Sequence, residues 1–342
     1  MFRILQTGNI PHAQLFTGIE GVGKLEAAVR FAMACNCHKA EIVVGHSASA
    51  EDKLNRKFST DVPCDACKSC RKISSRNHPD LITVDPQNKQ IRVAQIRELH
   101  GILAMKPYEA RYRFVIISDA HSMNVEAANA LLKVLEEPPH QTFLILTAHH
   151  RHDLLPTIAS RCQHVRFHPI SRKTLITYMK SQAELSDLDA GLLANLAKGS
   201  LSKALQLATS GWLARRTWIL NIISADPFKT KSVNPLATLL AFSEKLALSK
   251  EDLSEALEIM QTWFRDLMVL PTSPDKIMNQ DRIHDLERAA QHMDVQDAIS
   301  TYEAIQTTLD RIAGNANPRL VLDVLLLHFL GLYYEKDRRY PV

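Results

Sequence analysis

Short apolar runs alternate with helical patterns through the first half of the chain. The runs are AQLF, LITV, RFVIIS, TFLILT and HVRFH, and they lie between residues 13 and 168. Buried parallel strands read as nearly continuous apolar stretches, and the helices between them cover both faces of the sheet. The pattern therefore predicts an α/β domain over residues 1–168, built from βαβ units around a parallel sheet.

One helix of this domain has clear limits in the sequence. Its pattern begins near Ser122 and ends where Pro138 and Pro139 prevent further helix. Apolar residues recur along it at helical spacing, which predicts that one face is buried. The residues expected on that face are Val125, Ala128, Leu131, Leu132 and Leu135.

Strand patterns stop after Pro169, and helical patterns continue from there. Three short ones, SRKTLITYMKSQ, DAGLLANLAKGS and LSKALQLATS, predict a small helical domain over residues 169–210. From Trp212 onward the apolar spacing is helical, apart from the loop-like stretches ADPFKTKSVNP and PTSPDKIMNQ. Residues 211–342 are therefore expected to form an all-α bundle.

The stretch GIEGVGKL, residues 18–25, has the spacing of a phosphate-binding loop, G-x-x-x-x-G-K-[ST], except at its last position. Gly18, Gly21 and Gly23 would let backbone N–H groups turn toward an anion, and Lys24 would reach the phosphates. The alternative is a glycine-bearing turn that binds nothing. Leu25 stands where a Ser or Thr hydroxyl normally holds Mg²⁺, so metal-assisted hydrolysis of a bound nucleotide should be crippled.

A second acidic position follows the strand pattern RFVIIS. Asp119 could help to hold the water shell of a metal ion, or it could cap the next helix. The next residue, Ala120, stands where an active ATPase of this kind carries the Glu that activates water. Leu25 and Ala120 are independent departures, and both indicate a loop that is retained as part of the fold.

The composition limits the other function classes. A chain of 342 residues is long enough for two or three domains, and its formal charge of +4, with a pI near 8.7, is too mildly basic to indicate nucleic-acid binding without a clustered patch. No apolar run approaches the roughly 18 residues of a membrane span. The N-terminal stretch MFRILQTGNIPHAQ lacks the apolar core of a signal peptide, so a cytoplasmic protein without a membrane partner is expected.

The six cysteines are more consistent with metal ligands or buried thiols than with disulfides in such a protein. The spacing C-x-x-C-x-x-C is formed by Cys64, Cys67 and Cys70. These thiolates could share one tetrahedral zinc ion, with Cys37 or Cys35 as the fourth ligand. Iron–sulfur clusters use similar spacing, but the proline-following fourth Cys of such clusters is absent from this stretch. A closed Cys₄ site would be structural and would stabilise a module over about residues 35–78.

Several longer stretches resemble the clamp-loader subunits of bacterial DNA polymerase III. They are HAQLFTGIEGVGK, CDACKSC, HPDLITV, IRVAQIREL, AANALLKVLEEPP and LLPTIASRCQ. The match is dense over roughly residues 10–170 and thin beyond about residue 210. The resemblance implies an AAA+ ATPase domain with an inserted zinc module, a helical lid and a C-terminal collar. It also implies a hetero-pentameric ring with delta and gamma/tau subunits, which acts on the sliding clamp and primed DNA.

The resemblance gives the motif Ser160-Arg161-Cys162 a functional meaning. In this family the motif carries an arginine into the ATP site of the neighbouring subunit. Its planar cation stabilises charge on the transferred phosphoryl group, an effect on the order of 10³–10⁵ in rate in other enzymes. The alternative is a surface salt bridge worth well under about 1 kcal/mol. Cys162 itself is expected to be a small buried residue without chemistry.

The resemblance also marks two further positions of the nucleotide site. Thr147 matches the polar position that faces the γ-phosphate region, although a strand-end Thr is by default a β-branched strand residue. Lys203 stands where the lid often carries a phosphate-sensing arginine, and lysine keeps the charge without the bidentate geometry. The segment between Cys37 and Cys64 is longer than the family usually shows, so a histidine in it, His38 or His46, is a further candidate for the fourth zinc ligand.

Two functions from different classes stay open. In the first, the chain is a non-hydrolysing stator that donates Arg161, and ATP binding by its own loop is in doubt. In the second, it is an active ATPase of the gamma/tau type that tolerates Leu25 and Ala120. The end of the chain at Val342, without the usual gamma/tau extension, favours the stator.

A zinc-bearing nucleic-acid module is a third possibility. The basic residues beside the thiolates that could serve it are Lys68, Arg71, Lys72 and Arg76. Such a run is more often a solvated face than a binding surface. This reading is therefore the least favoured of the three.

Overall fold

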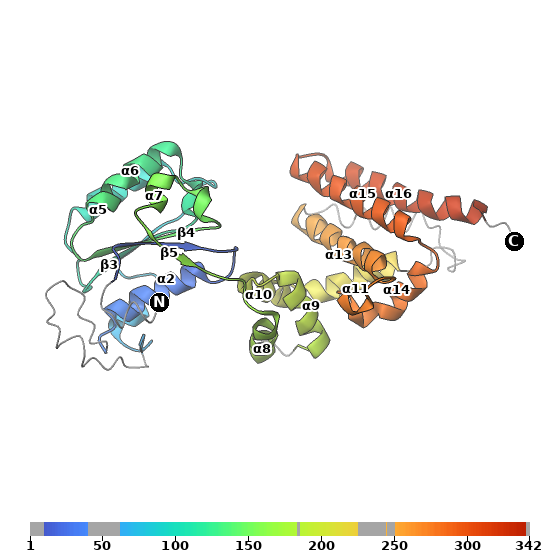
Figure 1. Ribbon diagram of the computed structural model, residues 1–342, viewed down its shortest axis with the longest axis horizontal. Coiled ribbons are helices and arrows are strands. Elements are labelled where there is room, and N and C mark those ends of the chain that lie inside the picture. The colour runs from blue at the N-terminus through green and yellow to red at the C-terminus, as the bar shows by residue number, and fades with distance from the viewer. Residues whose placement is uncertain (1–9, 40–61, 183–184, 225–243, 245–249, 340–342) are drawn as a thin grey trace. The chain divides into compact units, whose positions relative to one another are not determined.

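The computed structural model describes residues 10–39, 62–182, 185–224, 244 and 250–339 (Figure 1). The chain divides into two compact units, residues 1–171 with 198–203, and residues 172–197 with 204–342. The stretch ADPFKTKSVNP and the polar insertion that contains His46 lie outside the described residues. The expected division into an α/β domain, a lid and a collar stays a prediction.

Among the residues described, the first unit forms one five-stranded parallel sheet (Figure 1). The strands are β1 (Ala13–Thr17), β2 (Leu81–Val84), β3 (Arg113–Ile117), β4 (Thr142–Ala148) and β5 (Gln163–Arg166). Their order across the sheet is β2-β3-β4-β1-β5, and each neighbouring pair is parallel. Each strand coincides with one of the apolar runs, so the predicted parallel α/β sheet is confirmed.

Helices cover both faces of this sheet because its side chains alternate between two apolar clusters. The helices of the unit are α2 (Lys24–Asn36), α4 (Lys68–Ser74), α5 (Val93–Leu103), α6 (Val125–Glu136) and α7 (Pro156–Ala159), with the short 3₁₀ helices η1 (Ala120–Ser122) and η2 (Arg151–Asp153). Phe16 and Phe114 pack with residues of α2 and α4 on one face. Leu15 and Val115 pack with residues of α5, α6 and α7 on the other. The loops at the carboxyl ends of the strands are thereby held on a rigid layer.

Helix α6 begins later than its pattern predicts. Ser122 belongs to η1, and α6 starts at Val125, because the side chain of Asn124 caps it by accepting a backbone hydrogen bond. Val125 is 62% exposed, so the prediction that it faces the core is wrong. Leu131 is fully buried as expected, and the helix ends at Glu136, just before the two prolines.

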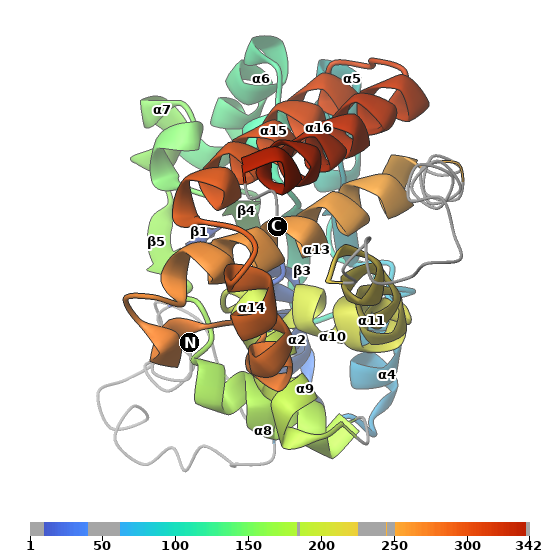
Figure 2. The same ribbon diagram turned by 90° about the vertical axis from the view of Figure 1, so that its right-hand side faces the viewer.

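The described part of the second unit is helical, as predicted. Its elements are α8 (Arg172–Gln182), α9 (Asp187–Ala197), α10 (Leu201–Thr209), α11 (Trp212–Ile223), α13 (Lys250–Val269), η3 (Pro274–Lys276), η4 (Gln280–Arg282), α14 (Ile283–Ala290), α15 (Val295–Ala313) and α16 (Pro318–Arg339), of which α10 begins in the first unit. Helices α15 and α16 run side by side in both views, and α15 packs on α13 (Figures 1 and 2). No helix in the described ranges is long and apolar enough to cross a bilayer.

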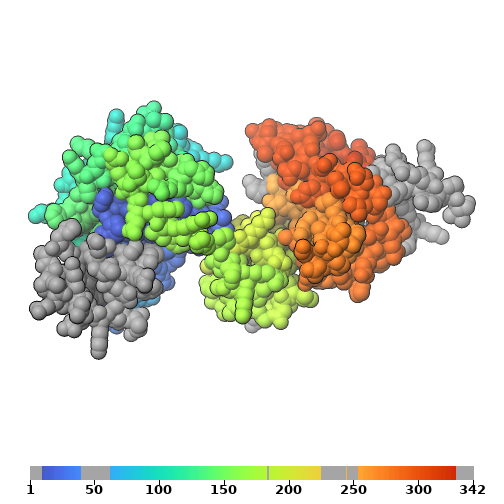
Figure 3. Space-filling view, in the orientation of Figure 1, coloured from blue at the N-terminus to red at the C-terminus, as the bar shows by residue number. Residues whose placement is uncertain are grey.

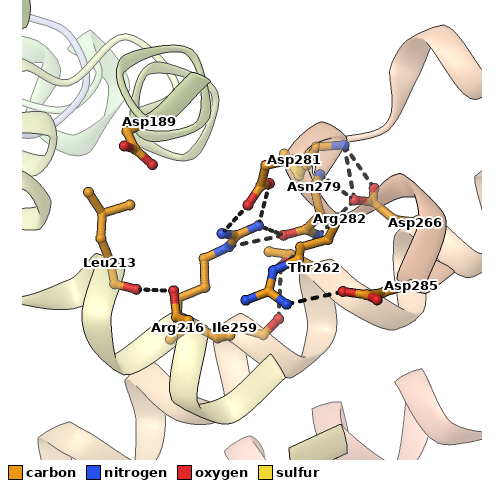
Figure 4. Close-up of polar contacts among 12 residues, drawn as sticks. Asp189, Leu213, Arg216, Ile259, Thr262, Asp266, Asn279, Asp281, Arg282 and Asp285 are labelled. Atoms are coloured by element: carbon orange, nitrogen blue, oxygen red, sulfur yellow. Dashed lines mark hydrogen bonds and ion pairs between the residues drawn. The ribbon is translucent and has the colours of Figure 1, made fainter. Parts of the chain in front are cut away.

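A buried polar network fixes the loop after α13 to α11 (Figure 4). Arg216, which is 2% exposed, donates to the two carboxylate oxygens of Asp281 at 2.7 and 2.9 Å and to Asn279 Oδ1 at 2.7 Å. The carboxylate of Asp266 is fully buried and accepts a 2.7 Å hydrogen bond from the backbone N–H of Asn279. Buried charges are tolerated when they are paired and hydrogen-bonded, so this network defines one position for the loop.

Candidate functional site

The loop between β1 and α2 lies at the carboxyl ends of the strands. The backbone N–H of Gly18 donates to the carbonyl oxygens of Ala148 at 3.3 Å and His149 at 3.0 Å, so the end of β4 fixes where the loop begins. A Cβ on Gly18 would lie 2.5 Å from the carbonyl oxygen of Phe167. A side chain cannot be accommodated this close to a backbone oxygen, so this position requires glycine.

The beginning of α10 lies directly on the loop. The backbone N–H of Ser202 donates to the Gly21 carbonyl at 3.1 Å, and a Cβ on Gly21 would lie 2.3 Å from Ser200 Oγ. Gly21 also has a φ of +70°, which L-residues rarely adopt. Sequence reasoning singled out Lys203 in this segment, and the structure places it, exposed, in the first turn of α10. It missed the two serines, because the contact joins segments far apart in the chain.

Lys24 is the first residue of α2 and is buried. Its Nζ donates to the carbonyl oxygens of Gly18 at 2.5 Å and Ile19 at 3.0 Å. Burial lowers the pKa of Lys24, and the carboxylates of Asp119 and Glu20 act in the opposite direction. The ammonium group therefore bridges two carbonyl groups of the loop, and the negative charge of Asp119 favours its protonated form.

Asp119 follows β3 in a left-handed conformation, with φ 45° and ψ 51°. Its backbone N–H donates to Thr147 Oγ1 at 2.9 Å, which links the ends of β3 and β4. The side chain of Asp119 is exposed and makes no cap hydrogen bond to η1, and the cap of α6 is Asn124. The alternative in which the Asp119 carboxylate caps the next helix is therefore wrong.

The two departures from an active site are apolar, and one of them, Ala120, is a core residue. Leu25 packs against the apolar cluster under α2. Ala120 is 1% exposed and belongs to the cluster on the opposite face of the sheet, with α5 and α6. Neither position offers an oxygen atom for a metal ion or a water molecule. The loop, the lysine and the Asp119 carboxylate are thus present, whereas the hydroxyl ligand and the general base are absent from these two positions.

Four cysteines of the first unit come together beside α2 and α4. The sulfur atoms of Cys37, Cys64, Cys67 and Cys70 all lie within 4.8 Å of one another. Cys35 is buried and is not part of this group, and His38 is exposed. The donor set fits a tetrahedral zinc ion, because four thiolates at this spacing need only small side-chain rotations to reach Zn–S distances of about 2.3 Å.

The backbone around the cluster favours thiolates at two of its members. Hydrogen bonds from backbone N–H groups lower the pKa of Cys64 to about 6. Burial acts to raise the pKa of Cys67, but backbone hydrogen bonds, including one from Cys70, outweigh it and lower this pKa. Burial raises the pKa of the Cys35 thiol and raises that of Cys162 to about 11, so both of these are inert, buried thiols.

Arg161 lies between α7 and β5. The green segment of the chain to which α7 and β5 belong reaches the visible surface of the first unit (Figure 3). Its Nη2 lies 2.9 Å from Oε1 of Glu136, and its Nη1 donates to the Thr157 carbonyl at 3.0 Å. The side chains of Arg161 and Glu136 are 39% and 52% exposed. The arginine therefore forms a surface salt bridge, which was the alternative to the arginine finger in the sequence analysis. Its side chain stays exposed and does not enter the interior of the unit.

Comparison with known protein families shows to which family this chain belongs. Residues 1–171 match the family described as DNA polymerase III, delta subunit, and residues 229–330 match the C-terminal part of a delta subunit. The chain belongs to the DNA polymerase III delta subunit family. The resemblance carried by GIEGVGK, CDACKSC and LLPTIASRCQ is therefore confirmed.

Relatives in this family are similar over most of the chain. The DNA polymerase III subunit delta′ of Bacillus subtilis is 28% identical over 331 residues, which are 96% of this chain and 93% of the relative. The subunit tau of the same organism is 29% identical over 280 residues, and the match covers 77% of this chain but 46% of tau. A gamma-subunit-related protein of Thermotoga maritima, with a solved structure, is 22% identical, with a TM-score of 0.41 over 79% of this chain and 90% of that one.

Proposed function

We propose that this chain is a non-hydrolysing clamp-loader subunit of the bacterial replicative DNA polymerase. It acts as a stator in the cytoplasm, helps to load the sliding clamp onto primed DNA, and donates Arg161 to the ATP site of a neighbouring subunit. The observation that carries the proposal is that the two positions hold apolar side chains, Ala120 buried in the core and Leu25 partly buried against it. The chain's own site therefore lacks two oxygen donors that ATP hydrolysis needs.

The surroundings of Arg161 are compatible with a role in trans. Exposed ion pairs contribute about 0.2–1 kcal/mol, so a triphosphate in a neighbouring subunit could readily replace Glu136 as the partner. A guanidinium presents a planar fork of donors that matches phosphate oxygens, and its charge is permanent. The arginine is half-exposed and preorganised by one backbone contact, to the Thr157 carbonyl.

The nucleotide site that remains in this chain is a degenerate one. It comprises the loop glycines, Lys24, Asp119, Thr147 and Lys203. Lys24 supports this reading, because its ammonium group is engaged by the loop's own carbonyl oxygens. We therefore assign the loop a mainly structural role and expect weak ATP binding at most.

Zinc is the proposed cofactor, bound by Cys37, Cys64, Cys67 and Cys70. The sulfur positions support it, and a closed site of four thiolates leaves no open coordination position. The ion would stabilise the module that connects α2 to α4, with no part in chemistry.

The proposed partners are the delta and gamma/tau subunits, in a hetero-pentamer that reaches the clamp and DNA through the assembly. The similarity to delta′ over 96% of the chain supports this assignment. The similarity to tau supports a second candidate, an active ATPase of the gamma/tau type. The two candidates differ in whether this chain hydrolyses ATP by itself.

Phosphate release by the purified full-length chain separates them. We expect turnover no higher than that of a Lys24→Ala variant, which removes the side chain that would bind phosphate. Equilibrium nucleotide binding should be recorded with both proteins, since a stator can bind nucleotide without hydrolysing it. Turnover in the native chain that Lys24→Ala abolishes would establish the gamma/tau-type ATPase instead.

A further inference from the structure

Two histidines and one aspartate meet at the carboxyl ends of β3 and β4. Asp119 follows β3, His121 lies in η1, and His149 directly follows β4. One potential ligand atom from each of the three side chains lies within 4.8 Å of the other two. The rings of His121 and His149 are 4.7 Å apart between centroids and inclined by 56°. Because β3 and β4 are neighbouring parallel strands, their ends bring these residues together from separate parts of the sequence.

We propose that Asp119, His121 and His149 form a binding site for a divalent transition-metal ion of the Zn²⁺ class. Imidazole nitrogens suit Zn²⁺, Co²⁺ and Ni²⁺, whereas Mg²⁺ requires oxygen ligands in an octahedral arrangement. A tetrahedral zinc ion with Zn–N distances of about 2.0–2.1 Å has ligand atoms about 3.3 Å apart. Small side-chain rotations bring the three residues to that spacing. The site goes beyond the clamp-loader role and does not depend on it.

An unsatisfied nitrogen provides a second observation that indicates a ligand. The Nδ1 atom of His121 is buried and has no hydrogen-bond partner. Buried polar atoms in proteins are rarely left unpaired, and a metal ion would satisfy this one. The other members of the cluster are accessible, since Asp119 is exposed and His149 half-exposed.

The backbone holds two of the three residues in place. Asp119 is fixed in its left-handed conformation by the hydrogen bond from its N–H to Thr147 Oγ1. His149 is fixed through its carbonyl, which accepts from Gly18. These main-chain hydrogen bonds fix where the Asp119 and His149 side chains start, at the ends of two neighbouring strands. Three protein ligands leave a further coordination position open, which a water molecule or a phosphate oxygen can occupy.

Cobalt titration of the full-length protein tests the site. Co²⁺ bound by thiolates shows strong sulfur-to-metal charge transfer, whereas Co²⁺ bound by nitrogen and oxygen shows only weak visible bands. We expect the protein to bind a Co²⁺ ion through nitrogen and oxygen ligands, in addition to any thiolate-bound Co²⁺. The protein should retain this nitrogen- and oxygen-ligated ion in excess Mg²⁺. His121→Ala and His149→Ala should each lower the affinity for that ion more than about 100-fold. Each removes a ligand, and even the loss of a hydrogen-bond partner of a ligand costs about 10–100-fold in metal affinity.

Two matched variants keep the test decisive. His152→Ala is the control, because His152 is 82% exposed, stacks on His150 and lies outside the cluster. Asp119→Asn alters an exposed side chain, so folding should be preserved while ion affinity falls at least about tenfold. Absence of a nitrogen-ligated ion, its displacement by Mg²⁺, or equal binding by the wild type and both histidine cluster variants would overturn the proposal.

Discussion

Residue 120 illustrates how a position of the proposed nucleotide site can belong to the core. The methyl group of Ala120 is 1% exposed and packs with the cluster under α5 and α6. Leu25 similarly contributes to the cluster under α2. Once these positions are packed by apolar groups, restoring the oxygen donors would disturb the packing around them. A polar side chain at position 120 is therefore expected to lower the stability of the α/β unit.

Ala120→Glu should therefore destabilise the protein. A carboxylate at this position would be buried without a partner, so we expect the free energy of unfolding to fall by more than about 2 kcal/mol. Val125→Glu is the control, since Val125 is 62% exposed, and its effect should stay within about 0.5 kcal/mol. Urea denaturation of the two variants measures the difference. Equal stability of both variants would show that position 120 is not packed as described.

Sequence reasoning found the residues that belong to a contiguous motif. The loop glycines and Lys24 follow β1, and Asp119 follows β3, as the strand patterns predict, while their role in a nucleotide site stays a prediction. Ser200 and Ser202, which lie on the loop, were missed, as was the pairing of His121 with His149. Such contacts depend on which strand ends are neighbours in the sheet, and a single sequence does not contain that information.

Whole elements were predicted better than their ends. The five strands appear where the apolar runs predict them, because a parallel strand buried on both faces leaves a strong hydrophobic signal. The start of α6 was misplaced by three residues, from Ser122 to Val125, because a 3₁₀ turn and the Asn124 cap precede it. Capping depends on the local backbone conformation, which the apolar spacing does not specify.

A single buried carboxylate organises the connection between α5 and β3. Asp80 is 2% exposed and accepts backbone hydrogen bonds from Tyr108 at 2.7 Å and from Glu109 and Ala110 at 2.8 Å. Burial acts to raise the pKa of Asp80, but these hydrogen bonds and the charge of Arg113 outweigh it, and the pKa is lowered. The stabilisation is therefore present above the unfolded-state pKa of about 3.9 and is lost as the pH falls below it.

Asp80→Asn should lower the free energy of unfolding by about 3 kcal/mol at neutral pH. The neutral amide would leave the backbone N–H donors with a weaker acceptor and Arg113 without the opposite charge of Asp80. The difference from wild type should narrow as the pH falls below about 4, where the unfolded carboxyl takes up its proton. Denaturation midpoints at a series of pH values measure both effects. Asp85→Asn, at an exposed position, is the control, and a pH-independent difference for Asp80→Asn would contradict the assignment.

The cysteine module gives a prediction about metal removal. Cys67→Ser should abolish tightly held, thiolate-bound zinc and lower the stability of α4, because the binding free energy of a structural zinc ion contributes to folding. Cys162→Ala should retain the zinc, since Cys162 lies outside the cluster. Metal analysis after dialysis, combined with hydrogen exchange of α4, gives the readout. Zinc retained by Cys67→Ser would remove this residue from the ligand set.

At the scale of the whole molecule, the chain combines an α/β unit, which holds the proposed degenerate nucleotide site, with a second unit that is helical where described. Composition and the mild net charge excluded few classes of function. The expected assembly and its partners came from the resemblance to clamp-loader subunits, because the hydrophobic patterns do not specify them. Ring order and collar contacts depend on other chains, so they are not encoded in any local pattern. The exposed position of Arg161 is the feature of this chain on which the proposed role in such an assembly rests.

ATP turnover in the reconstituted clamp-loader complex tests the role of Arg161 most directly. Arg161→Ala should fold normally, because it removes only a surface ion pair, yet lower turnover at the neighbouring site by at least about 100-fold and impair clamp loading. Arg161→Lys should restore little, since lysine lacks the planar fork, and Arg166→Ala, at an exposed position in β5, should match wild type. Wild-type turnover in the Arg161→Ala complex would contradict the proposed stator with an arginine finger.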